Sequence, residues 1–226
     1  QILQSGIVDI IELGAGNGRL ACDLLSELAT LCSVPRRYRI LETSADLRER
    51  QRELIQREVP QLAACVEWLD VLPAPLNALV LANEVLDAMP VHLIEVRASG
   101  IAERGVTIVN DRFEWLARPA AGAVLASAQT LNLAPRYITE INLAARSFIS
   151  TLGANLEHGV ALFIDYGFAA REYYHPQRNS GTLMCHYRQH AHDDPLCLVG
   201  LQDITAHLDF SALAAAAEVS GLSVLG

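Results

Sequence analysis

The sequence contains no lysine. All 17 of its basic residues are arginines, and with 26 acidic residues the 226-residue chain has a formal net charge of −9. Binding to nucleic acid needs clustered cations that neutralise phosphates. The shortage of positive charge therefore argues against a nucleic-acid partner.

Long apolar runs are also missing. No run reaches the roughly 20 residues that a membrane-spanning helix needs, and the first residues, QILQSGIVD, lack the basic-then-apolar pattern of a signal peptide. We therefore expect a soluble protein without a membrane partner. Because the sequence starts on a strand and stops at GLSVLG, where another strand would begin, we also expect a fragment that lacks N-terminal and C-terminal parts, and with them any targeting segment.

Cysteine is scarce and irregularly placed. The five cysteines are odd in number, widely spaced and mostly within apolar segments. This pattern predicts free, buried thiols in a reducing compartment rather than a disulfide framework.

Strand and helix patterns alternate along most of the chain, which at 51% hydrophobic residues can bury a core as a single domain over residues 1–226. The predicted strands are 7–13, 37–42, 65–69, 77–82 and 160–166. The predicted helices are 18–31, 44–58 and 136–152. This order predicts an α/β fold with a mostly parallel, doubly wound sheet, in which ligands bind at the carboxyl ends of the strands.

Two stretches break the alternation. Residues 91–116 have the pattern of a β-hairpin or meander inserted beside the fourth strand. Residues 167–203 are polar with little periodicity, as in a lid or binding loop on the substrate side. After them a strand is predicted through Thr205, His207 and Asp209, followed by a helix over 210–219.

The stretch IELGAGNGRL places Gly14, Gly16 and Gly18 between a predicted strand and a helix, where glycine permits positive φ and close approach of a ligand. A dinucleotide-binding turn has its third glycine one residue later, where Arg19 stands. The preceding ELGAG, with Glu12 inside the strand end, instead resembles the first motif of Rossmann-like S-adenosylmethionine-dependent methyltransferases. A glycine turn without any ligand is the alternative.

Two further acids stand at the ends of predicted strands. Glu42 could accept hydrogen bonds from both ribose hydroxyls of a nucleoside, and Asp70 could accept one from an exocyclic adenine amine. The alternative for each is an ordinary surface acid, because acids at strand ends are common. Their shared position at one sheet edge favours the binding role.

The segment LANEVLDAMPVH has the most specific chemistry. Asn83, Glu84 and Asp87 cluster after an apolar strand, where a transferred methyl group would emerge, and His92 follows. The alternative is that Asn83 caps a short helix and the two acids stabilise its first turn.

Five motifs together resemble one family. ELGAGNGRL, LANEVLDAMPVH, FIDYG, EYYHPQRNSGTLMCHYRQHAHDDP and GLQDITAHLDF are similar to the MidA-like family, which includes the mitochondrial complex I assembly methyltransferase. The resemblance implies a class I methyltransferase fold with S-adenosyl-L-methionine as cofactor. The mitochondrial member is a protein arginine methyltransferase that acts on a large hydrophilic subunit of complex I. We expect the N-terminal region that usually precedes the first strand in this family to be missing from this chain.

The resemblance implies a protein substrate with an accessible arginine. A homodimer is a candidate assembly, and we expect a location in the cytoplasm for a bacterial chain or in the mitochondrial matrix for a eukaryotic one. Carboxylates suit a guanidinium because they can hold it by two parallel hydrogen bonds. Glu84 and Asp87 are the first candidates, with Asp165 of IDYG next, and His92 is the candidate proton acceptor.

The polar segment offers candidate substrate contacts that could stack on an arginine-bearing loop or pair with it; these are Tyr173, Tyr174, His186, Tyr187 and Asp193. Ordinary packing is the alternative for the tyrosines. A metal site is not expected, because HYRQHAHDDP lies in a predicted irregular stretch and lacks the helical H-x-x-x-H spacing of catalytic zinc sites. A non-catalytic assembly scaffold and an NAD-dependent dehydrogenase stay open as other functions.

Overall fold

The computed structural model describes residues 9–225, which fall into two compact units. The first combines the described residues through Val85 with Leu152–Asp165, and the second combines Leu86–Thr151 with the described residues from Tyr166 onward. Residues 7 and 8 of the first predicted strand lie outside the described residues. The single-domain organisation stays a prediction.

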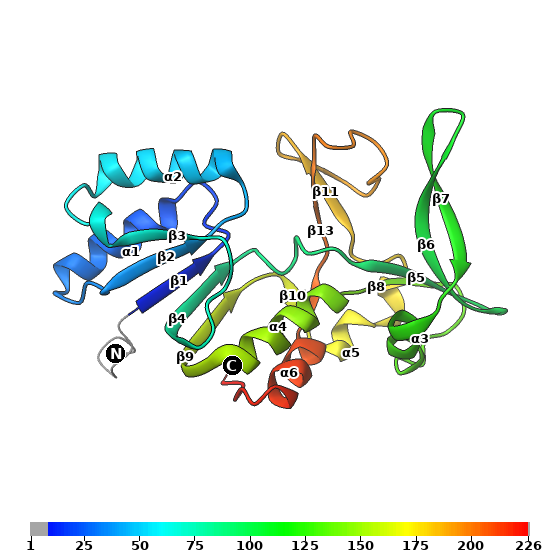
Figure 1. The fold of residues 1–226 in the computed structure, drawn as a ribbon. Helices are drawn as coiled ribbons and strands as arrows, with labels where there is room; N and C mark the ends of the chain where they lie inside the picture. The colour runs from blue at the N-terminus through cyan, green and yellow to red at the C-terminus, as the bar shows by residue number, and fades with distance from the viewer. Residues whose placement is uncertain (1–8, 226) are drawn as a thin grey trace. The chain divides into compact units, whose positions relative to one another are not determined.

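The first unit contains a five-stranded, all-parallel sheet in the order β3-β2-β1-β4-β9 (Figure 1). Its strands are β1 (Asp9–Leu13), β2 (Arg37–Leu41), β3 (Val66–Leu69), β4 (Leu76–Asn83) and β9 (Leu156–Ile164). The central strand β1 is buried along its whole length, as expected when both sheet faces are covered. The predicted parallel α/β sheet is therefore confirmed, with its last strand starting four residues earlier than predicted.

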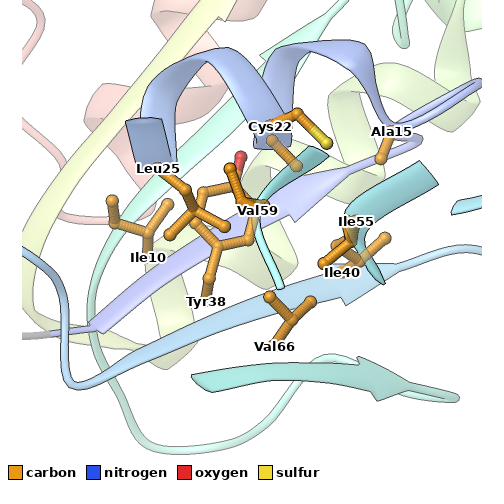
Figure 2. Packing of buried hydrophobic residues seen from close by; sticks show 10 residues of the cluster. Ile10, Ala15, Cys22, Leu25, Tyr38, Ile40, Ile55, Val59 and Val66 are labelled. Carbon is orange, nitrogen blue, oxygen red and sulfur yellow. The ribbon is translucent and has the colours of Figure 1, made fainter. Parts of the chain in front are cut away.

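Helices α1 (Arg19–Thr30) and α2 (Ala45–Glu58) pack on this sheet through a hydrophobic core. Figure 2 shows strand side chains such as Tyr38 and Ile40 against Leu25 and Ile55 of the helices. All four are at most 1% exposed, and burying each side chain contributes roughly 1.5–3 kcal/mol. This core fixes the helices over the strand ends that carry the candidate site.

The second unit contains a four-stranded antiparallel sheet in the order β7-β6-β5-β8. Its strands are β5 (His92–Arg97), β6 (Gly100–Val109), β7 (Arg112–Pro119) and β8 (Tyr137–Ile141), and helix α3 (Gly122–Gln129) packs on it. Residues 91–116 thus contain antiparallel strands, as their pattern indicated. β4 itself pairs with β1 and β9 and with none of these strands.

The predicted helix over 136–152 is wrong in its first part. Residues 137–141 form β8, and helix α4 (Leu143–Asn155) begins only after Asn142. The Asn142 side chain accepts a hydrogen bond from the Ala145 backbone N–H at 2.8 Å, as an N-cap does. The five residues before it, YITEI, are mostly β-branched or aromatic, as is favoured in strands, and Thr139 and Ile141 are buried on the sheet.

The polar segment is more regular than its sequence suggests. Within 167–209 the structure has β10 (Gly167–Phe168), α5 (Ala170–Tyr173), η3 (Pro176–Arg178), β11 (Met184–Tyr187), β12 (His190–His192), β13 (Asp203–Thr205) and β14 (Leu208–Asp209). The predicted strand through Thr205 to Asp209 is therefore two short strands. Helix α6 (Phe210–Val219) matches its prediction, and the strand expected at the end of the chain does not form over 222–225.

None of the helices within residues 9–225 is long and apolar enough to cross a membrane.

Candidate active site

The carboxyl ends of the five parallel strands meet at one edge of the first unit's sheet. Leu41, the last residue of β2, pairs with Leu13 on β1 and with Leu69 on β3. On the other side of β1, Asn83 at the end of β4 pairs with Ile164 at the end of β9. The residues at or just beyond this edge are Glu42, Asp70, Asn83, Glu84 and Asp165.

The strand order reverses beside β1, because β2 and β3 lie on one side of it and β4 and β9 on the other. Such a switch point opens a crevice outside the carboxyl ends of the strands, where open α/β sheets bind ligands. The glycine turn after β1 therefore occupies the position that a ligand-binding turn requires.

The glycine turn is left-handed at its three glycines and open at the middle one. Gly14, Gly16 and Gly18 have φ of 60°, 54° and 83°. The Gly14 backbone N–H donates to the Leu41 carbonyl oxygen at 3.0 Å, and the Gly18 N–H donates to Ala15 at 2.8 Å. A Cβ on Gly16 would have no atom within 4 Å, so this space is available to a ligand.

Glu42 lies just after β2 and is 7% exposed. Its Oε1 accepts a hydrogen bond from the Ser44 backbone N–H at 3.0 Å, and its Oε2 accepts one from Gln51 Nε2 at 3.3 Å. A carboxylate has about four lone-pair sites. The two bonds therefore orient Glu42 and leave acceptor capacity for ligand hydroxyls.

Arg48 of α2 joins the ends of β2 and β3. Its Nε donates to the Glu42 carbonyl oxygen at 2.6 Å, its Nη2 to the Leu69 carbonyl oxygen at 2.6 Å, and its Nη1 to Asp70 Oδ1 at 2.7 Å. The Asp70 side chain is 86% exposed. Asp70 thus presents a carboxylate to solvent at this edge, and Arg48 holds the end of β3 in place. The role of Asp70 toward adenine stays a prediction.

Arg48 and Gln51 were missed by the sequence analysis. Gln51 is fully buried although it is polar, and it lies on the inward stripe of α2 between Leu47 and Ile55 at spacings of four residues. A polar residue on an otherwise apolar stripe is the signal that could have identified it.

Glu12 lies inside β1 and is 3% exposed. Its Oε2 accepts a hydrogen bond from the Tyr38 hydroxyl at 2.7 Å. Burial raises the pKa of the Glu12 carboxyl, and the hydrogen bond from Tyr38 offsets part of that rise. Burial likewise raises the pKa of Tyr38. A cofactor-binding role for Glu12 stays a prediction.

Asn83 ends β4, and Glu84 follows it. Both lie near the glycine turn, since a Cβ on Gly14 would lie 3.2 Å from Val85 Cγ2. Glu84 is exposed, its backbone N–H donates to the Ile164 carbonyl oxygen at 2.9 Å, and its φ is +50°. That conformation costs a non-glycine residue roughly 1–2 kcal/mol. No helix forms over 84–91, so the helix-cap alternative for Asn83 is wrong.

Two of the four candidate catalytic residues belong to the second unit, and Glu84 and Asp165 belong to the first. Asp87 is 6% exposed, and its backbone carbonyl accepts a hydrogen bond from the Ala206 N–H at 3.0 Å. His92 begins β5, and its Nδ1 lies 2.7 Å from Glu103 Oε1. Glu103 thereby orients the imidazole and leaves Nε2 as the ring nitrogen for proton transfer.

The predicted substrate residues differ in exposure. Tyr173 is 3% exposed, and its hydroxyl donates to Glu140 Oε2 at 3.2 Å, which favours packing over substrate contact. The Tyr174 ring packs edge-on against Tyr173 with centroids 4.8 Å apart, and burial raises the pKa of both hydroxyls. The remaining three predicted contacts are on or near β11, with His186 and Asp193 exposed and Tyr187 partly exposed. Their roles stay predictions.

Glu140 was also missed. Although it is only 2% exposed, its Oε1 accepts hydrogen bonds from the backbone N–H groups of Thr182 and Leu183, at 2.9 and 3.0 Å. Its Oε2 accepts one from the Thr182 hydroxyl at 3.0 Å. This carboxylate anchors the polar segment to β8. Within the described part of the chain, no group of three or more His, Cys, Asp or Glu side chains is placed to hold a metal ion.

The chain matches, over residues 1–226, a family model described as "Putative S-adenosyl-L-methionine-dependent methyltransferase". The chain belongs to this family. The resemblance to MidA-like methyltransferases and the Rossmann-like fold class are thereby confirmed, and the family description names the cofactor that the sequence predicted.

A solved structure and curated relatives that resemble this chain are also methyltransferases by name. One similar protein of known structure is a superfamily member from Burkholderia thailandensis, whose crystal structure contains bound S-adenosyl-homocysteine. Its sequence is 48% identical to this chain, and the two structures match with a TM-score of 0.91 over 96% of this chain and 57% of that chain. The mitochondrial protein arginine methyltransferase NDUFAF7 is 28% identical in Mus musculus and 27% in Homo sapiens, over 93% of this chain and 52% of each relative. The chain thus spans about half the length of these curated relatives.

The raised pKa of Glu12 predicts a pH-dependent stability. In the unfolded chain this carboxyl ionises near its ordinary pKa of 4.5, whereas in the folded protein it ionises only at a higher pH. The free energy of unfolding therefore falls as pH rises from 4.5 to the folded pKa, by about 1.4 kcal/mol for each pKa unit between the two states. Glu12→Gln keeps an acceptor for Tyr38 and removes this loss. In urea unfolding without cofactor, the free energy of unfolding of Glu12→Gln should rise relative to that of the wild type across this pH range. Glu27→Gln, at an exposed position, should show no such relative rise. Parallel profiles for Glu12→Gln and wild type would contradict the raised pKa.

The left-handed backbone of Glu84 predicts that Glu84→Gly stabilises the fold. Glycine adopts φ of +50° without the Cβ penalty, so the free energy of unfolding should rise by about 1 kcal/mol. The same exchange at exposed Glu53 in α2 should lower it by about 1 kcal/mol. Denaturant melts of both variants provide the comparison, and destabilisation by Glu84→Gly would show that the strain is absent.

Proposed function

We propose that this protein is an S-adenosylmethionine-dependent methyltransferase that methylates an arginine side chain of a protein. The observation that carries the proposal is the open, left-handed turn at Gly16, set at the switch point of the sheet with Glu42 and Asp70 on the neighbouring strand ends. Family membership and the S-adenosyl-homocysteine bound by the Burkholderia thailandensis relative support the cofactor. The names of the curated relatives support the arginine.

The residues of the first unit fit the cofactor. The open space at Gly16, which a Cβ would occupy, lets a ligand approach the backbone. Glu42 has the acceptor capacity for two ribose hydroxyls, and Asp70 offers an exposed carboxylate for an adenine amine. Glu12, Gly14, Gly18 and Asn83 complete the set of residues that we assign to the cofactor.

When bound, S-adenosylmethionine supplies a methyl group on a sulfonium with a neutral thioether as leaving group. The protein then needs to position the acceptor in line with that methyl group, and no metal or covalent nucleophile is required for this. The carboxylates of Glu84, Asp87 and Asp165 each suit a guanidinium, which a carboxylate binds by charge-assisted hydrogen bonds. His92, oriented by Glu103, would accept at Nε2 the proton that the nitrogen loses.

The substrate and location are further parts of the proposal. The resemblance to MidA-like proteins extends the substrate class to a large hydrophilic subunit of respiratory complex I. The mitochondrial names of the relatives support the matrix for a eukaryotic form, and we place a bacterial form in the cytoplasm. The substrate contacts would come from the exposed residues of the polar segment, foremost His186 and Asp193.

Gly16→Val tests the cofactor site with a matched control. Gly122 has nearly the same φ, 56° against 54°, and a Cβ on Gly122 would likewise have no atom within 4 Å, so valine strains both backbones alike. Titration calorimetry with S-adenosylhomocysteine should show at least a ~100-fold loss of affinity for Gly16→Val and wild-type affinity for Gly122→Val. Tighter binding of NAD than of S-adenosylhomocysteine by the wild type would instead favour a dehydrogenase.

Asp87→Asn separates chemistry from cofactor binding. The amide keeps the shape of the carboxylate but loses the charge that would pair with the guanidinium, so turnover should fall by roughly 100-fold or more while cofactor affinity stays. Transfer of labelled methyl to an arginine-containing protein substrate measures turnover, with exposed Asp203→Asn as control. Equal loss of binding and turnover would contradict this role. Cofactor binding by the wild type without any transfer would favour a scaffold.

A further inference from the structure

Gln51 of α2 is completely buried, yet its side-chain amide contacts three different segments of the first unit. Its Nε2 donates to the Gly16 carbonyl oxygen at 2.8 Å and to Glu42 Oε2 at 3.3 Å. Its Oε1 accepts a hydrogen bond from Trp68 Nε1 at 2.8 Å. Both N–H donors and the oxygen acceptor of this amide are therefore used. They bond to the turn after β1, to the residue after β2, and to β3.

The backbone of Gln51 lies close to the glycine turn. A Cβ on Gly18 would lie 3.2 Å from Gln51 Cγ and 3.3 Å from Gln51 Cα. The glycine at position 18 thus lets α2 approach the turn closely, and Ile55, one turn further along α2, is buried in the hydrophobic core. The close approach at Gly18 and the burial of Ile55 thus place α2, and with it the Gln51 amide, beside both Gly16 and Glu42.

We propose that Gln51 is a positioning residue that sets the Glu42 carboxylate relative to the open turn at Gly16, and thereby determines recognition of the ribose. This inference rests on the proposed function, in which Glu42 accepts the ribose hydroxyls. Gln51 links the two parts of the site that must contact one nucleoside at the same time: the backbone that the ligand approaches and the carboxylate that binds its sugar.

The role of Gln51 differs from that of Arg48. Arg48 holds the backbone carbonyl of Glu42 together with β3, and it makes no hydrogen bond to the Glu42 carboxylate or the glycine turn in the described residues. An uncharged amide suits position 51 better than a carboxylate or an alkyl group. A carboxylate there would face a carbonyl oxygen and a second carboxylate, and an alkyl group would supply no donor.

The test compares S-adenosylhomocysteine with its 2′-deoxy analogue by titration calorimetry. In Gln51→Leu the affinity for S-adenosylhomocysteine should fall by about 10- to 100-fold, with a smaller fall for the analogue, so that the wild-type preference for the ribose largely disappears. Gln56→Leu, on an exposed position of the same helix, should keep that preference. Equal losses for the two ligands would reduce Gln51 to a structural residue and overturn the proposal.

Gln51→Glu provides a second readout if the leucine variant does not fold. The variant keeps an acceptor for Trp68 but places its carboxylate against Glu42, and two adjacent carboxyls share a proton at low pH. The affinity of Gln51→Glu for S-adenosylhomocysteine should therefore recover as pH falls, relative to Gln56→Glu. If the ratio of the affinities of Gln51→Glu and Gln56→Glu does not change with pH, the inference about Gln51 is overturned while the proposed function stands. If the wild type does not bind S-adenosylhomocysteine at all, the proposed function itself is overturned.

Discussion

The candidate site depends on the parallel register of the first unit's sheet. Because Leu13, Leu41 and Leu69 pair side by side, the residues that follow them leave the sheet at a common edge. A shift of a strand by one residue would reverse which side chains face each side of the sheet. The buried core between the sheet and helices α1 and α2 (Figure 2) holds this register, so the chemistry at the edge is set by apolar packing behind it.

The site itself carries costs that the core must offset. Glu84 is held in a left-handed conformation, Glu12 is buried where its charged form is disfavoured, and Gln51 is a buried polar side chain. Each has a local compensation: a backbone hydrogen bond for Glu84, the Tyr38 hydroxyl for Glu12, and three partners for Gln51. Strained or buried polar groups concentrated beside one open turn are typical of a functional site rather than of a surface loop.

Much of this edge could be predicted from local sequence. The glycine turn is recognisable by residue type, and Glu42, Asp70 and Glu84 follow apolar runs whose ends fix their positions. What failed was the choice between two periodicities over 136–152, where a short strand and a helix meet at Asn142. Gln51 and Glu140 could not be assigned, because their roles depend on partners distant in sequence, such as Trp68 and Thr182.

The central claim is that the turn at Gly16 and the carboxylate of Glu42 bind one S-adenosylmethionine nucleoside. A crystal structure of this protein with S-adenosylhomocysteine tests it most directly. The account predicts the nucleoside across residues 14–18, with its ribose hydroxyls on the Glu42 carboxylate. A ligand bound elsewhere on the protein, or a ribose that makes no contact with Glu42, would contradict it.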